Sequence, residues 1–198
     1  MRRLALFGAG VFVVAALLLA LHRDLPGWYA QAMPSWYARA VYPLEHEKLI
    51  RQAARRNDLD PALVAAVIYA ESGFREAAES ESGAVGLMQL LPSTAKEIAR
   101  RTGGERFEVA DLRDPRVNIR YGSNYLRYLL DAREGSLVEA VAAYHAGVRN
   151  VDRWADGAGG ELSVDDIPFV DTHDYVHEVI GLIDVYRRAY GAELGPTS

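Results

Sequence analysis

The chain has 198 residues, half of them hydrophobic and a quarter charged, with a formal net charge of −5. The acidic balance argues against nucleic-acid binding, because phosphate contacts need a basic face. The absence of cysteine excludes disulfides, thiolate nucleophiles, cysteine-based zinc sites and a lipoprotein anchor.

An uncharged apolar run covers residues 4–21, directly after Arg2 and Arg3. Eighteen helical residues span about 27 Å, close to the thickness of the hydrocarbon core of a bilayer. Since flanking arginines stay in the cytoplasm, the rest of the chain is expected on the extracytoplasmic side, in the cell envelope. We therefore assign residues 1–22 to a transmembrane anchor. A cleaved signal peptide is the alternative, although the first Ala-x-Ala sequence, Ala30-Gln31-Ala32, lies well beyond the run.

Residues 23–43 are expected to form a membrane-proximal stalk, because three prolines interrupt this segment. A single domain is expected over residues 44–192, followed by a short tail over residues 193–198. About 150 residues suffice for one compact domain with its own core.

The expected fold class of this domain is all-α, because apolar residues recur at helical spacing and alternating strand patterns are scarce. The sequence predicts helices over residues 44–56, from Asp60-Pro61, from Thr94 to Gly103, from Asp114-Pro115, over 140–146 and over 172–190. Each of the pairs Asp60-Pro61 and Asp114-Pro115 combines a capping side chain with a first-turn proline. Thr94 with Glu97, and Ser136 with Glu139, have the spacing of a capping box.

Glu71 is the main candidate for chemistry. It follows the apolar stretch 63–70 and precedes Gly73, where the helix is expected to end. Both the helix C-terminus and apolar surroundings disfavour a negative charge, and so both raise the pKa of a carboxyl group. A carboxyl that keeps its proton near neutral pH can act as a general acid on a glycosidic oxygen. A solvated glutamate at a helix end is the alternative.

Two further segments hold polar groups in apolar surroundings. Residues 83–92 contain two glycines and a lone glutamine, Gln89, which needs polar partners if it is buried and could bind a sugar amide or hydroxyl. Tyr144 precedes Gly147 at an expected helix end and could present its hydroxyl to a carboxyl or a sugar. A tight loop with a satisfied core glutamine, and a packed tyrosine beside a glycine cap, are the alternatives.

The order of these segments along the chain is more specific than any one of them. Glu71-Ser72-Gly73-Phe74 comes first, then Ser80 with Gly83-Ala84-x-Gly86-Leu87-Met88-Gln89-x-x-Pro92-x-Thr94-Ala95, then Ala143-Tyr144-x-Ala146-Gly147. With Ile167-Pro168-Phe169, Thr172 and Tyr175-Val176, this pattern closely resembles the catalytic domain of the soluble lytic transglycosylase family. The resemblance covers residues 44–190, essentially all of the expected domain.

The resemblance implies a lysozyme-like helical fold with a glycan groove. Glu71 matches the family's catalytic glutamate, which cleaves the β-1,4 bond between N-acetylmuramic acid and N-acetylglucosamine of peptidoglycan and leaves a 1,6-anhydromuramyl end. No cofactor is implied. The positions expected to bind substrate are Ser80, Met88, Gln89, Tyr144, His145, Asp171 and Tyr175. A hydrolytic muramidase of the same fold and a non-catalytic glycan-binding or scaffold module are the alternatives, and no protein partner is indicated.

The chain departs from the family pattern at several positions. His145 stands where asparagine is usual, Asp171 where glutamate is common, and His173 where arginine is common. Gly147-Val148-Arg149 replaces a glycine-proline-glycine sequence. These changes bear on subsite preference and pH optimum more than on the reaction.

His173 and His177 lie four residues apart, the spacing of two zinc ligands on one helical face. The glutamate of the zinc-protease motif is missing, with Asp174 in its place, and the sequence offers no obvious third ligand. We therefore expect a polar helix face and no metal, and we expect Asp165-Asp166 to be a solvated loop.

Overall fold

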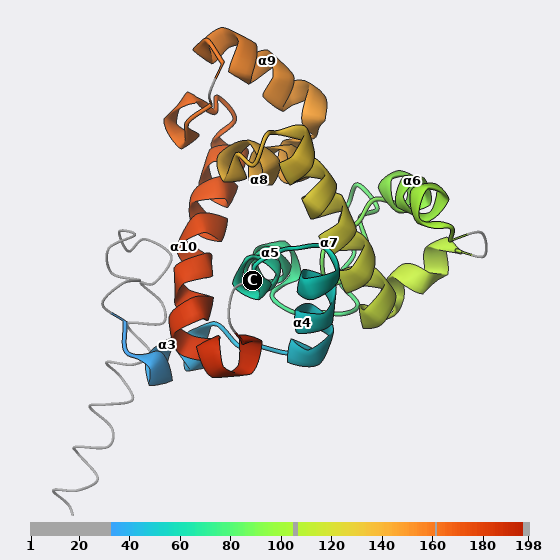
Figure 1. The fold of residues 1–198 in the computed structure, drawn as a ribbon, viewed down its shortest axis with the longest axis vertical. Helices are drawn as coiled ribbons and strands as arrows, with labels where there is room; N and C mark the ends of the chain where they lie inside the picture. Colours follow the sequence, from blue (N-terminus) through green and yellow to red (C-terminus); the bar gives the residue numbers. More distant parts are fainter. Residues whose placement is uncertain (1–32, 105–106, 161, 196–198) are drawn as a thin grey trace, which may run out of the picture.

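The computed structural model describes residues 33–104, 107–160 and 162–195, and the predicted anchor over residues 1–22 lies outside them. This part of the chain is built from helices and short 3-10 turns (Figure 1). In chain order these are α3 (Ser35–Val41), α4 (Glu47–Arg56), α5 (Pro61–Ser72), α6 (Pro92–Thr102), η2 (Val109–Arg113), α7 (Pro115–Ala132), α8 (Leu137–Ala146), α9 (Val148–Ala158), η3 (Val164–Asp166) and α10 (Val170–Leu194). The described residues contain no strand, only isolated bridges that join Val85 to Glu79 and to Leu90. The expected all-α class is confirmed for them.

Helix α5 is the centre of the domain. Every residue from Pro61 to Ile68 is buried, so the helix is apolar on all sides and other elements must cover it. Figure 1 shows α5 nearly end-on, with α10 along one side and α4 and α7 along the other. Because α5 is enclosed in this way, the residues at its C-terminal end are held on a rigid support.

Local capping starts two helices as predicted, whereas two expected capping boxes differ in the structure and the helix expected over residues 44–56 begins at Glu47. Asp60 and Asp114 cap α5 and α7 as expected, accepting hydrogen bonds from the amides of Ala62 at 2.8 Å and Arg116 at 2.7 Å. The capping box expected at Thr94 is wrong, because α6 begins at Pro92 and Thr94 is already inside its first turn.

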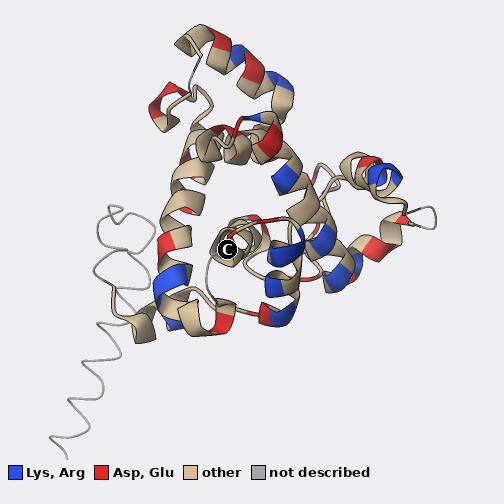
Figure 2. Ribbon diagram, viewed as in Figure 1, with Lys and Arg blue, Asp and Glu red and all other residues tan. Residues whose placement is uncertain are grey.

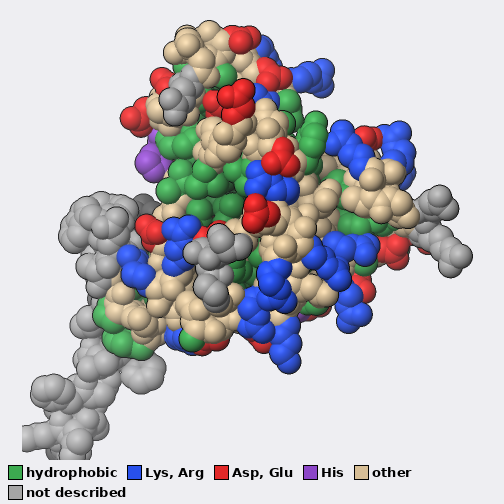
Figure 3. All heavy atoms as spheres, in the orientation of Figure 1, with side chains coloured by type: hydrophobic (Ala, Val, Ile, Leu, Met, Phe, Trp, Pro, Cys, Tyr) green, Lys and Arg blue, Asp and Glu red, His purple; other side chains and the backbone are tan. Residues whose placement is uncertain are grey.

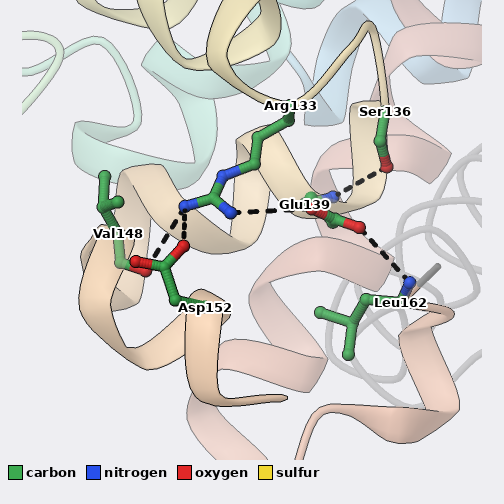
Figure 4. A network of polar contacts seen from close by, with 6 residues as sticks. All are labelled: Arg133, Ser136, Glu139, Val148, Asp152 and Leu162. Carbon is green, nitrogen blue, oxygen red and sulfur yellow. Dashed lines mark hydrogen bonds and ion pairs between the residues drawn. The ribbon is translucent and has the colours of Figure 1, made fainter. Parts of the chain in front are cut away.

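At α8 only half of the expected box forms. The Ser136 hydroxyl accepts from the Glu139 amide at 3.4 Å, whereas the Glu139 side chain turns to other partners. Its oxygen Oε1 accepts from the Leu162 amide at 3.3 Å, and Oε2 lies 3.8 Å from Arg133 (Figure 4). Arg133 also donates to the Asp152 carboxylate at 2.7 Å. This network joins α8 to α9 and to the segment that leads into α10.

Part of the expected stalk packs on the domain. Residues Ser35–Val41 form α3, whose Tyr37, Ala38 and Val41 are buried. The Tyr190 hydroxyl of α10 donates to the carbonyl of Tyr42 at 2.9 Å. Among the residues that the structure describes, none of the helices combines the length and the apolar character needed to cross a membrane.

Candidate active site

Glu71 lies in the last turn of α5, as expected, and the helix ends at Gly73 in the left-handed conformation (φ 57°). The carboxyl group is largely buried, and this burial raises its pKa from 4.5 to about 7. The charge of Glu178 adds to the rise, whereas a hydrogen bond from Tyr175 opposes it. Near neutral pH the protonated and ionised forms are therefore both populated, which suits a group that gives up a proton and takes one back.

Tyr175 is the direct partner of Glu71. Its hydroxyl, on α10, donates to Oε1 of Glu71 at 2.7 Å. Burial and the Glu71 charge both raise the pKa of Tyr175 well above its ordinary value, so this phenol remains a donor. It fixes the direction of the carboxyl group and stabilises the carboxylate form.

The loop over residues 83–92 is fastened beside Glu71. The Ser72 hydroxyl donates to the carbonyl of Leu87 at 2.7 Å, and the Asn118 side chain accepts from the Met88 amide at 2.8 Å. Asn118 also donates to the carbonyls of Val85 and Leu112, at 2.8 and 2.9 Å. These three hydrogen bonds of Asn118 join a loop and a turn that lie far apart in the sequence.

Gly86 is required where this loop crosses Asn118. Its φ is 80°, and a Cβ atom there would lie 2.3 Å from Nδ2 of Asn118 and 2.6 Å from the Leu112 carbonyl oxygen. A side chain would push the loop off Asn118, so glycine is needed both for conformation and for space.

Met88 packs into the core beneath the loop. Its side chain is fully buried, and it packs so closely on α7 that a Cβ at Gly122 would lie 2.3 Å from its sulfur. Its carbonyl accepts a hydrogen bond from the Tyr144 hydroxyl at 2.8 Å. Met88 thus holds the loop down and positions Tyr144, and its assignment to the substrate-binding residues stays a prediction.

Gln89 stands at the partly exposed edge of the same loop, in a left-handed conformation (φ 45°). Its amide nitrogen donates to the carbonyls of Ala78 at 3.1 Å and Gly86 at 2.9 Å. The loop thus uses the NH₂ group, and the amide oxygen is the end that can accept from a substrate. Ser80 closes the other side of the loop, where its hydroxyl accepts from the Ala84 amide at 3.0 Å and pairs with Ser82 at 2.8 Å.

His145 packs against Tyr175. The two rings stack with centroids 4.5 Å apart, and Nδ1 of His145 lies 3.1 Å from the Thr172 hydroxyl. Loss of solvation lowers the pKa of His145, and the Asp171 carboxylate opposes this effect. Asp171 itself is exposed. Tyr144, His145 and Tyr175 are thereby gathered on the Glu71 side of α8 and α10, and the Glu71 charge contributes to raising the pKa of Tyr144.

Several contributors to the site were given no role from the sequence, although Ser72 and Thr172 belong to the pattern that resembles the family. Ser72 and Asn118 act through contacts between distant segments, and Thr172 acts through His145. From α7, the Tyr125 ring packs 5.5 Å from that of Tyr144, and Tyr128 stacks on Tyr125. These two tyrosines line a cavity of about 290 Å³ against α6. Their spacing in the sequence is that of an ordinary helix face, so it gave no indication of a ligand site.

Residues 48–164 match the family described as the transglycosylase SLT domain, which is more than half of the chain. The chain belongs to this family. The soluble lytic murein transglycosylase of Salmonella typhimurium is 30% identical over 160 residues, which cover 76% of this chain and 24% of that protein. The endo-type membrane-bound lytic murein transglycosylase A of Klebsiella pneumoniae strain 342 is 35% identical over 134 residues, or 62% of this chain and 64% of that protein.

Solved structures agree with the lysozyme-like fold expected from the sequence. An inactive mutant of the lytic transglycosylase Slt of Pseudomonas aeruginosa superposes with a TM-score of 0.72 at 30% identity, covering 80% of this chain and 26% of that one. The 70-kDa soluble lytic transglycosylase of Escherichia coli gives a TM-score of 0.74 at 27% identity, covering 89% and 30%. The chain thus spans about a quarter of the length of the soluble relatives it matches.

Proposed function

We propose that this protein is a peptidoglycan lytic transglycosylase with Glu71 as its single acid/base. The observation that carries the proposal is the largely buried Glu71 carboxyl, with a pKa of about 7 and a 2.7 Å hydrogen bond from Tyr175. Membership of the SLT family supports the reaction class.

In this mechanism protonated Glu71 donates its proton to the glycosidic oxygen between N-acetylmuramic acid and N-acetylglucosamine as the bond to the muramyl anomeric carbon breaks. The resulting carboxylate takes the proton of the muramyl 6-hydroxyl, whose oxygen attacks that carbon and closes the 1,6-anhydro ring. Glu71 ends the cycle protonated, and no water is consumed. The substrate's own acetamido group assists, so a second carboxylate nucleophile of the usual glycosidase kind is not needed.

The proposed substrate contacts are the amide oxygen of Gln89, the Tyr144 hydroxyl, and His145 with Asp171 at the opposite side of the carboxyl group. Ser80 shapes the loop that carries Gln89. The tyrosines of α7 extend this surface toward the 290 Å³ cavity, where aromatic rings suit the apolar faces of sugars.

We place the enzyme in the cell envelope, held by the apolar segment 4–21. The occurrence of relatives whose names describe them as membrane-bound supports this placement. The organisation into anchor (1–22), connecting segment (23–43), catalytic domain (44–192) and tail (193–198) is part of the same proposal.

Mass spectrometry of sacculi digested with the purified protein tests the reaction. Anhydromuramyl ends are expected from wild type and none from Glu71→Gln, which keeps the size and hydrogen-bonding shape of the side chain. Reducing muramic acid ends would identify a hydrolase instead. An absence of products, with glycan binding retained, would identify a binding module.

A further inference from the structure

A cluster of possible metal ligands forms where η3 meets α10. Asp165 of η3 lies beside His173 and His177 of α10, and one ligand atom from each residue lies within 4.8 Å of the other two. Oδ1 of Asp165 is 4.0 Å from Nε2 of His173, and the two imidazole centroids are 4.8 Å apart. The fold thus supplies the third ligand that could not be found in the sequence.

The two imidazoles share one face of α10, and that face is not the one used by the proposed active site. With about 100° between successive helical residues, His173 and His177 differ in direction by about 40°, whereas Tyr175 points about 200° away from His173. Accordingly Tyr175 is buried against Glu71, while His177 is exposed and His173 is 32% exposed in its side chain. In Figure 3 histidine side chains are visible at the surface near this end of α10.

The hydrogen bond of His173 to its neighbour leaves one of its ring nitrogens available as a metal ligand. Nδ1 of His173 lies 3.0 Å from Oδ1 of Asp174, and since a carboxylate can only accept, this nitrogen carries the proton. The lone pair of His173 is then on Nε2, the nitrogen that faces Asp165. A carboxylate behind a ligating histidine is the usual support of such a ligand.

The η3 turn also separates its two acids. Asp166 caps the turn, accepting from the Ser163 amide at 3.0 Å and from the Ser163 hydroxyl at 2.6 Å. Asp165 does not cap the turn, and its side chain is 93% exposed beside His173. Ile167, directly after the turn, is buried and fixes η3 to the core.

The local charge favours a cation. Between Arg153 and Arg187 the sequence contains no lysine or arginine, whereas acidic residues recur throughout this stretch. Figure 2 shows acidic residues on η3, with Lys and Arg concentrated on α4 and α7 instead.

We propose that Asp165, His173 and His177 bind a divalent transition metal ion of the zinc class. Two imidazoles and one carboxylate favour zinc over magnesium or calcium, which prefer oxygen ligands. Ligand atoms on a tetrahedral zinc ion are separated by about 3.4 Å, since each lies about 2.1 Å from the metal. The present spacings need only rotation of exposed side chains to reach that value. With water in the fourth position, the ion joins η3 to the first turns of α10, behind the helix face that carries Tyr175.

Zinc titration of the tag-free full chain in detergent micelles, followed by calorimetry, tests the site without any glycan. One zinc ion per chain is expected to bind, with a rise in Tm, and cobalt is expected to give the visible absorption of a tetrahedral site. Calcium and magnesium are expected to give neither. Because no substrate is present, the outcome is independent of the proposed enzyme activity.

Three variants locate the ion. His177→Ala and Asp165→Asn are expected to abolish the saturable binding, and Asp174→Asn to weaken it by about tenfold or more. His46→Ala is the matched control, because His46 also faces a carboxylate, that of Glu76 at 3.1 Å, but lies at the start of α4. Absence of stoichiometric zinc binding in wild type would overturn the proposal, as would unchanged binding in His177→Ala or an equal loss in His46→Ala. Circular dichroism of each variant verifies that it is folded.

Discussion

The hydroxyl of Tyr175 and the carboxyl group of Glu71 are joined by a 2.7 Å hydrogen bond between α10 and the end of α5. These helices form the largest packing interface of the described domain. The position of the proposed acid/base is therefore set by the core and not by a loop. The bond stabilises the carboxylate, while burial destabilises it, and the balance leaves the pKa of Glu71 at about 7.

Replacement of Tyr175 by phenylalanine is expected to raise the pKa of Glu71 further, because it removes the hydrogen bond that lowers it. If Glu71 must be protonated to start the reaction, the alkaline limb of kcat/KM against pH will move to higher pH. In addition, kcat will fall because the carboxyl group loses its orientation. The measurement is a pH profile on purified glycan strands. Tyr190→Phe is the control, since that hydroxyl bonds to the Tyr42 carbonyl, and an equal shift in both variants would contradict the assignment.

The raised pKa of Glu71 also has a cost in stability. A carboxyl whose folded-state pKa lies above its unfolded value binds more protons when folded, so the free energy of unfolding falls as pH rises from about 4.5 to about 7. Over this window the contribution is on the order of 3 kcal/mol. Glu71→Gln cannot ionise, and its stability relative to wild type is expected to increase by up to that amount between pH 4 and pH 8. Urea unfolding at the two pH values measures the difference; a pH-independent difference would mean that Glu71 has an ordinary pKa.

Gly86 and Gly83 form a matched pair in the loop beside Glu71. Both have φ near 80°, but a Cβ at Gly86 would collide with Asn118 and the Leu112 carbonyl, whereas nothing lies within 4 Å at Gly83. Alanine at Gly83 is expected to cost about 1–2 kcal/mol, the strain of a left-handed conformation. Alanine at Gly86 should cost about 1–3 kcal/mol more because of overpacking, with a loss of activity in the folded fraction. Equal values of the free energy of unfolding would show that Asn118 does not constrain the loop.

The network around Glu139 offers a test of how the segment leading into α10 is held. Glu139→Gln removes the charge that faces Arg133 and is expected to cost about 1–3 kcal/mol, since both side chains are only 11% exposed. Glu97→Gln is the surface control. It breaks exposed pairs with Arg100 and Arg101 and should cost at most about 1 kcal/mol. Chemical denaturation compares the two, and a larger loss for Glu97→Gln would contradict the burial argument.

The sequence predicted those features that depend on neighbouring residues. Asp60-Pro61, Asp114-Pro115 and Gly103 encode helix ends within one turn, and the structure confirms them. Helix α9 was not predicted, because the segment after Gly147 begins without a capping side chain.

The residues of the site also fall into those predictable from neighbouring residues and those that depend on distant contacts. Glu71 could be predicted from the sequence because its helix, its apolar neighbours and the following glycine are adjacent in the chain. The hydrogen bonds of Asn118 and Ser72 to the loop join residues 15 or more positions apart, so local patterns could not reveal them. The packing of Met88 on α7 could not be predicted for the same reason, since it depends on the absence of a side chain at Gly122.

The contact of α3 with the far end of α10 determines how the domain is attached to whatever precedes it. Tyr190, which bonds to the Tyr42 carbonyl, follows Tyr175 by fifteen residues, or about 22 Å along the helix. The chain nevertheless enters the domain beside the last turn of α5, because the Tyr69 hydroxyl, two residues before Glu71, donates to the Val41 carbonyl at 3.4 Å. An enzyme tethered through that point would meet its polymer at a set height above the lipid surface, and the length of the connecting segment would decide which layer of the wall it can reach.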